Sequence, residues 1–91
     1  MKNAEKIIVA LESKGFKVEN HELFLIASRT LENGRFDCLF VDIKYSFLKG
    51  TMKYKITNYN SNNYDDDPKK KVILRQGDLN KVIKRIDEQF A

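Results

Sequence analysis

Residues 23–59 decide the fold of this chain, and they read LFLIASRTLENGRFDCLFVDIKYSFLKGTMKYKITNY. Apolar and polar residues alternate through most of this stretch, a pattern that predicts half-buried β-strands. Two turn signals interrupt the pattern, Asn33-Gly34 and Lys49-Gly50, and Asn-Gly is a strong signal for a two-residue hairpin turn. The stretch therefore predicts an antiparallel meander with strands over 23–32, 35–48 and 51–59.

Two-residue turns at both signals fix which residues face one another. They place Ala27 opposite Phe40, and Tyr45 opposite Tyr54. This pairing gathers the apolar side chains of all three strands on one face of the sheet, and a shift of one residue would distribute them over both faces. We therefore expect that face to be the core. That face carries Phe24, Ile26, Leu39, Val41, Ile43, Tyr45, Phe47, Met52, Tyr54 and Ile56.

Helical patterns flank the meander. Residues 3–13 place apolar side chains at helical spacing, with Asn3 as cap and Gly15 after the end. Asp78 is the expected N-cap of a second helix, whose apolar face comprises Leu79, Val82, Ile83, Ile86 and Phe90. Short strands are expected over 16–19 and 72–75.

The polar stretch 58–71, NYNSNNYDDDPKKK, predicts a flexible loop. The whole chain, 1–91, is expected to form a single small α+β domain. Its order is an N-terminal helix, an antiparallel β-meander of three to five strands, the polar loop and a C-terminal helix.

Composition narrows the class of protein. One cysteine excludes an intramolecular disulfide, and one histidine excludes a Cys/His structural zinc site within a single chain. No apolar run approaches the ~18 residues of a membrane span, and Glu5 precedes the first apolar stretch, so neither a membrane helix nor a secretory signal is expected. We therefore expect a cytoplasmic protein with no membrane partner. The net charge of +4 only weakly favours anionic partners.

The residue types that carry catalysis do not converge. The predicted register separates Cys38 from His21 by roughly 27 Å, far beyond hydrogen-bond reach. Asp42-Ile43-Lys44 resembles part of a restriction-type nuclease site but lacks a second carboxylate on the same side. The consecutive Asp65, Asp66 and Asp67 are unsuited to converge on one metal ion. The sequence thus predicts no enzyme, no metal site, no cofactor and no small-molecule substrate.

The second sheet face is the most informative feature. It should combine apolar and aromatic residues at one end with lysines at the other, which is unusual for a solvated face. Leu23, Leu25, Ala27 and Leu31 should lie on it, together with Phe16 and Val18 if the first hairpin turns at Asn20-His21. The candidate binding residues on this face are Arg29, Phe36, Phe40, Lys44, Lys53, Lys55 and Tyr59.

Three explanations of this face remain open. A helix covers it, or it binds a protein partner or a second copy of the chain, or it is a platform for single-stranded nucleic acid. The function predicted first is a small non-catalytic binding protein that acts through a protein–protein surface. The alternative is a small basic nucleic-acid-binding protein.

Composition and layout suggest an origin. Lysine, asparagine and isoleucine exceed alanine, glycine and proline, which favours an A/T-rich genome such as that of a low-GC bacterium or its phage. The layout resembles that of some small phage-encoded anti-CRISPR proteins, whose DNA-mimicking members are acidic, unlike this chain. We therefore predict a phage or mobile-element accessory or inhibitor protein. The topology also resembles the double-stranded RNA-binding domain, but here 69–71, KKK, precede a strand-like VILR instead of opening the second helix.

Overall fold

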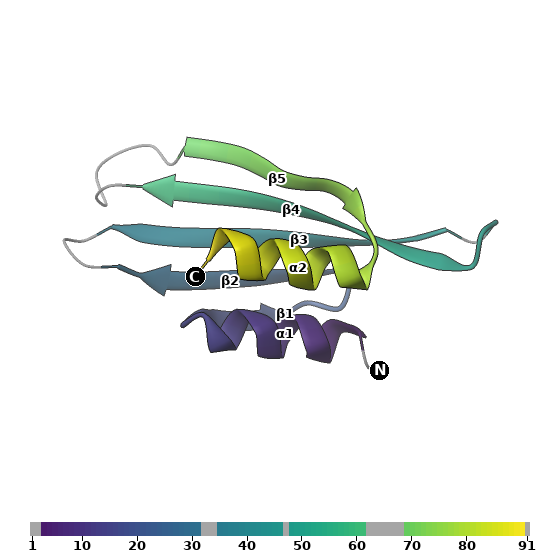
Figure 1. The fold of residues 1–91 in the computed structure, drawn as a ribbon, viewed down its shortest axis with the longest axis horizontal. Coiled ribbons are helices and arrows are strands. Elements are labelled where there is room, and N and C mark those ends of the chain that lie inside the picture. The colour runs from purple at the N-terminus through teal and green to yellow at the C-terminus, as the bar shows by residue number, and fades with distance from the viewer. Residues whose placement is uncertain (1–2, 32–34, 47, 62–68, 91) are drawn as a thin grey trace.

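The computed structural model describes residues 3–31, 35–46, 48–61 and 69–90. Five strands form one antiparallel sheet in the order β1-β2-β3-β4-β5, and both helices lie on the same face of it (Figure 1). The predicted α+β fold class is confirmed. The elements are α1 (Asn3–Ser13), β1 (Lys17–Asn20), β2 (Phe24–Thr30), β3 (Phe36–Ser46), β4 (Thr51–Ser61), β5 (Lys69–Gly77) and α2 (Leu79–Gln89).

The helix ends follow from local capping chemistry. After α1, Gly15 adopts a φ of +88°, and the Phe16 N–H donates to the Leu11 carbonyl at 3.2 Å. This is the glycine-terminated helix end in which the residues before and after the turn pack together, and it carries both Leu11 and Phe16 into the core. At the start of α2, the Asp78 carboxylate accepts from the Lys81 N–H at 3.0 Å.

The core lies between the helices and the sheet face that they cover. Its fully buried side chains come from both helices and from the three central strands, and they are Ile7, Leu11, Leu25, Ala27, Leu39, Val41, Ile56, Val82 and Ile86. Among the described residues, no helix is long and apolar enough to cross a membrane.

The predicted pairing of β2 with β3 is wrong by one residue. Ala27 lies opposite Leu39, not Phe40, and the Leu31 N–H donates to the Arg35 carbonyl at 2.6 Å. Three residues, 32–34, therefore separate the paired positions where a two-residue turn was predicted. An odd shift turns β2 over, because successive side chains point to opposite faces. Leu25 and Ala27 are consequently core residues.

The predicted pairing of β3 with β4 is shifted by two residues. Tyr45 lies opposite Met52, and Ser46 lies opposite Thr51, so four residues rather than two separate the strands. An even shift keeps every side chain on its predicted face. The predicted faces of β3 and β4 therefore hold. Tyr45 and Met52, which were predicted as core residues, are nevertheless exposed, and Phe47 lies outside the described residues.

The polar stretch predicted as a loop over 58–71 is shorter than expected. Residues 58–61 belong to β4 and 69–71 to β5, with Asn58 opposite Lys71 and Asn60 opposite Lys69. The remainder, 62–68, lies outside the described residues. Further along β5, two register shifts break the strict alternation, which explains why the consecutive Ile73 and Leu74 are both buried.

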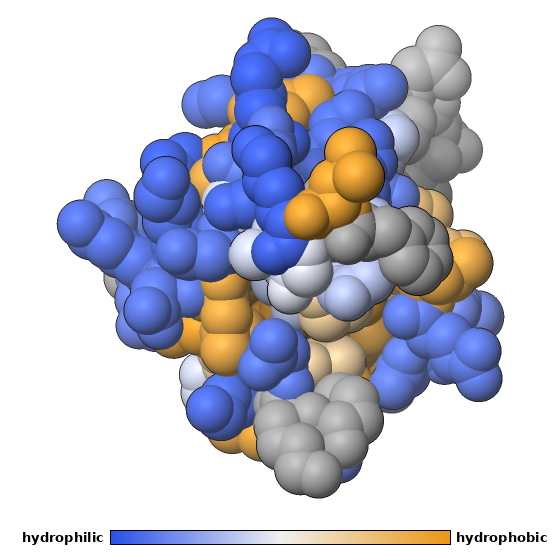
Figure 2. Space-filling view, turned by 90° about the vertical axis from the view of Figure 1, so that its right-hand side faces the viewer, coloured by the Kyte–Doolittle hydropathy of each residue, from blue (hydrophilic) through white to orange (hydrophobic). Residues whose placement is uncertain are grey.

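The ends of β3 and β4 project from the body as a two-stranded ribbon (Figure 1). We define this ribbon as residues 44–53. It accounts for an elongated molecule of 45 × 23 × 23 Å. Leu48 is fully exposed, Tyr45 is 52% exposed and Met52 is 38% exposed. Viewed onto this end, hydrophobic residues stand among predominantly hydrophilic ones (Figure 2).

Candidate functional site

The sheet face turned away from the helices is the candidate functional site, and we call it the open face. Neither α1 nor α2 covers it (Figure 1), so the explanation in which a helix completes a second core layer is wrong. The pairing of the strands places on it Lys17, Glu19, Phe24, Ile26, Ser28, Thr30, Phe36, Cys38, Phe40, Asp42, Lys44, Lys53, Lys55, Thr57, Tyr59, Lys70 and Val72.

An aromatic stack crosses the open face from the β1–β2 turn to β3. The rings of Phe24 and Phe40 stack at 4.8 Å between centroids and 14° between planes. The His21 ring stacks in turn on Phe24, at 4.8 Å and 20°. Ile26 lies directly opposite Phe40 and beside this stack. We call His21, Phe24, Ile26 and Phe40 the aromatic patch.

Six of the seven candidate binding residues do share the open face. Phe36, Phe40 and Lys44 come from β3, and the pairing of β3 with β4 brings Lys53, Lys55 and Tyr59 to the same side. Tyr59 lies opposite Cys38, whereas Lys53 lies directly opposite Lys44. Lys44, Lys53 and Lys55 lie toward the ribbon, as predicted. Lys70 lies opposite Tyr59 and Phe24 lies opposite Asp42, however, so aromatic residues and lysines are not divided between the two ends of the face.

Arg29, the seventh candidate, was predicted on the open face, and this prediction is wrong. It lies on the face that the helices cover. Its Nε is 3.3 Å from Oδ2 of the buried Asp37, and one terminal nitrogen donates to the Lys14 carbonyl at 2.8 Å. The guanidinium also lies over the rings of Phe16 and Phe90, at 4.7 and 5.2 Å from their centroids. The one-residue shift in the pairing of β2 with β3 exchanges the two faces of β2 and so places Arg29 on the covered side. Its contacts make Arg29 a structural residue.

Phe24 and Ile26 are open-face residues that the sequence analysis placed in the core. The run Leu23–Ala27 is apolar at every position, so hydrophobic alternation could not show which side of β2 is buried. Which side of β2 is buried depends only on the length of the turn between β2 and β3. Asn33-Gly34 predicts a turn of two residues, whereas three residues separate the paired positions. His21 joins the patch through its ring, which alternation does not predict either.

The titratable groups on the open face do not form a reactive pair. Burial, and to a smaller extent the negative charge of Glu19, raises the pKa of the Cys38 thiol above its ordinary value, which disfavours the nucleophilic thiolate. His21 Nε2 lies 3.2 Å from Glu19 Oε2. Asp42 lies opposite Phe24 and Lys55, not opposite a second carboxylate. Across the described ranges, no group of three His, Cys, Asp or Glu residues could hold a metal ion; Asp65–Asp67 lie outside those ranges.

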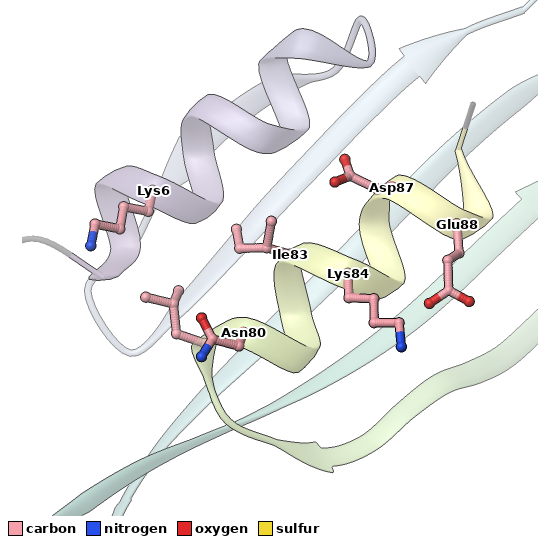
Figure 3. A pocket seen from close by; sticks show the side chains of 7 residues that line it. Lys6, Asn80, Ile83, Lys84, Asp87 and Glu88 are labelled. Carbon is pink, nitrogen blue, oxygen red and sulfur yellow. The ribbon is translucent and has the colours of Figure 1, made fainter.

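A groove between the two helices is one of the concave surfaces of the molecule. Ile83 lies between α1 and α2, and charged side chains of both signs surround it, including Lys6, Lys84 and Asp87 (Figure 3). Its volume is about 490 Å³. Two lysines and two carboxylates are among the residues that line it, so their charges balance.

Comparison with protein-family models, curated proteins and solved structures finds no match to this chain.

Proposed function

We propose that this protein is a non-catalytic binding protein whose open face docks onto another protein. The observation that carries the proposal is the aromatic patch on a sheet face that neither helix covers. An antiparallel sheet with one free face normally presents polar residues on that face. Here Phe24, Ile26 and Phe40 lie side by side instead, and contiguous apolar surface of this kind is typical of a protein interface.

The geometry of the rings favours a protein over a nucleic acid. Bases bind to single-strand platforms by stacking on the free faces of aromatic rings. Phe24 stacks on both His21 and Phe40, so the faces of its ring are already engaged within the protein. The edges of stacked rings are well suited to pack against apolar side chains of a partner.

The charged residues around the aromatic patch indicate which charge the partner carries around its apolar centre. Lys44, Lys53 and Lys55 flank the patch on the side of the ribbon, while Asp42 and Glu19 are the carboxylates among the described open-face residues. Complementary charge speeds association and excludes wrong partners. We therefore propose a partner with an apolar centre and an acidic rim, and thus a different protein rather than a second copy.

A single-stranded nucleic acid is the second candidate partner, and one observation favours it. Phe36, Phe40 and Tyr59 share their face with five lysines, which is the combination of stacking groups and phosphate contacts that such platforms use.

The test starts from capture of partners from a host lysate, with and without nuclease, and continues with the purified partner. Phe40→Ala should weaken binding by about 30-fold, as expected for loss of a central aromatic anchor worth about 2 kcal/mol. The matched control is Val9→Ala, which removes an apolar side chain that is 65% exposed on α1. Thermal denaturation of each variant separates lost binding from lost folding.

Each outcome decides between the candidates. A protein partner that survives nuclease and loses affinity only for Phe40→Ala supports the proposal. Capture that nuclease abolishes favours the nucleic-acid alternative. A dimer of the chain itself that Phe40→Ala dissociates would make the partner a second copy. Unchanged affinity of the folded Phe40→Ala variant for its partner would overturn the role of the aromatic patch.

A further inference from the structure

Four positively charged side chains line one small pocket at the base of the ribbon. They are Lys44, Lys53, Lys55 and Arg75, and the pocket volume is about 210 Å³. Tyr45, Tyr54 and Gln76 complete the lining. The pocket shares no residue with the aromatic patch, although Lys44, Lys53 and Lys55 are also the lysines that flank the patch.

Strand pairing explains why the four cations converge. Lys44 and Lys53 lie directly opposite each other, and Lys55 follows Lys53 on the same side of β4. Arg75 lines the pocket because the pairing of β5 with β4 is irregular at this point. Tyr54 pairs with Gly77 and Ile56 pairs with Leu74, so Lys55 faces two residues, Arg75 and Gln76. A β-bulge of this kind redirects side chains, and here it turns the basic side of β5 toward the lysines of β4.

Within the described chain, none of the four pocket cations forms an ion pair. The ion pairs there join Lys14 to Asp87, His21 to Glu19 and Arg29 to Asp37, and none involves a pocket cation. Asp42 lies opposite Lys55 but does not line the pocket. Like charges directly opposite each other on neighbouring strands destabilise a sheet. The arrangement therefore favours an anion that brings several negative charges into one place.

We propose that this pocket binds the phosphate chain of an oligophosphate, either free or as part of a nucleotide. Phosphate groups concentrate several charges in a small volume, whereas a carboxylate brings one. Arginine binds phosphate oxygens through two parallel hydrogen bonds, and lysine binds them as a point charge. A volume of about 210 Å³ is below the roughly 300 Å³ at which pockets for drug-sized ligands begin, so it suits a compact anion.

The test uses the full chain with two probes, sodium tripolyphosphate and ATP without divalent cations, at constant ionic strength. Calorimetric titration should show saturable binding of one anion per chain, and the melting temperature should rise with anion concentration, because a ligand that binds only the folded state stabilises it. The double variant Lys53→Gln/Arg75→Gln should lower the affinity for both probes at least tenfold.

The matched control is Lys17→Gln/Lys70→Gln, which removes the same charge from lysines on the same face but outside the pocket. It should bind both probes as the unaltered chain does. Tighter binding of tripolyphosphate would identify a free oligophosphate as the ligand, and tighter binding of ATP would identify a nucleotide.

Three results would overturn the proposal. They are the absence of saturable binding, an equal loss in both double variants, and binding of ATP without tripolyphosphate, which would make the nucleoside the recognised part. All variants keep the aromatic patch intact. Failure of the pocket is therefore distinguishable from failure of the proposed protein interface, and neither proposal requires the other.

Discussion

Arg29 shows how one side chain can join four elements. It lies in β2 and contacts the carbonyl that follows α1, the carboxylate of Asp37 in β3, and the ring of Phe90 after α2. Asn60 in β4 donates to the other oxygen of Asp37. A buried carboxylate is tolerated because this network satisfies it. The charge thus serves the core rather than a binding surface.

Arg29→Ala should lower the free energy of unfolding by about 3–5 kcal/mol, because it leaves the carboxylate of Asp37 buried without its cation. Arg29→Lys should recover only part of this loss, since lysine lacks the planar group that both stacks on rings and forms several hydrogen bonds. Urea denaturation measures both values. The control is Arg35→Ala, an exposed arginine, which should change stability by no more than about 0.5 kcal/mol. Equal losses for Arg29→Ala and the control would contradict the structural role.

At the scale of elements, α2 separates fully buried positions from a half-buried one. Val82 and Ile86 are inaccessible to solvent, whereas Ile83 is partly exposed at the groove between the helices (Figure 3). The sequence pattern places all three on one apolar face and cannot rank them. The position of α1 beside α2 decides which of them contacts the sheet.

Ile86→Ala should cost about 2–5 kcal/mol of stability, as truncation of a fully buried aliphatic side chain does. Ile83→Ala should cost roughly half as much, because solvent already reaches the side chain and less apolar surface leaves the core. Chemical denaturation of the two variants measures the difference. A loss for Ile83→Ala as large as that for Ile86→Ala would mean that the groove is closed in solution.

The elements that the sequence predicted well are those whose local chemistry is unambiguous. Gly15 and Asp78 mark helix ends through backbone conformation and a side-chain hydrogen bond. In β3 and β4, real alternation fixed the faces, so an error of two residues in pairing did no harm. In β2, where every residue from Leu23 to Ala27 is apolar, one residue of turn length exchanged the two faces.

The ends of β4 and β5 escaped prediction for a different reason. Asparagine and lysine are uncommon in strands, so the strand signal of β4 ends at Tyr59 and residues 69–71 carry none. They pair because hydrogen bonding continues outward from the apolar part of the hairpin, where Ile56 lies opposite Leu74. The bulge that assembles the basic pocket is equally invisible in sequence, because it depends on how β5 accommodates two consecutive buried residues.

At the scale of the whole molecule, the two faces of the sheet differ in what covers them. The helices and nearly all fully buried side chains lie on one side, and the aromatic patch lies on the other. The edges of the sheet are protected: β1 has only four residues, and β5 carries lysines and bulges. Protected edges are consistent with the proposal that a partner docks on the open face rather than on a sheet edge.

The ribbon extends beyond this body, and its removal should leave the body intact. Deleting residues 45–52 and joining Lys44 to Lys53 through Asn-Gly respects their direct pairing. The described side chains of the deleted segment include none of the fully buried ones, so the free energy of unfolding should change by no more than about 1 kcal/mol. Small-angle scattering should show a maximum dimension shorter by about 7–10 Å, the length of two to three strand residues.

Replacing Leu48 by Ser in the full chain is the control for this deletion. It alters a side chain that is fully exposed, so it should change neither stability nor dimensions. Binding of the protein partner should survive in the shortened chain, because His21, Phe24, Ile26 and Phe40 all lie outside the deleted segment. A loss of several kcal/mol on deletion would mean that the ribbon packs onto the body in solution. Loss of the partner with unchanged stability would move the interface from the open face to the ribbon's exposed apolar residues.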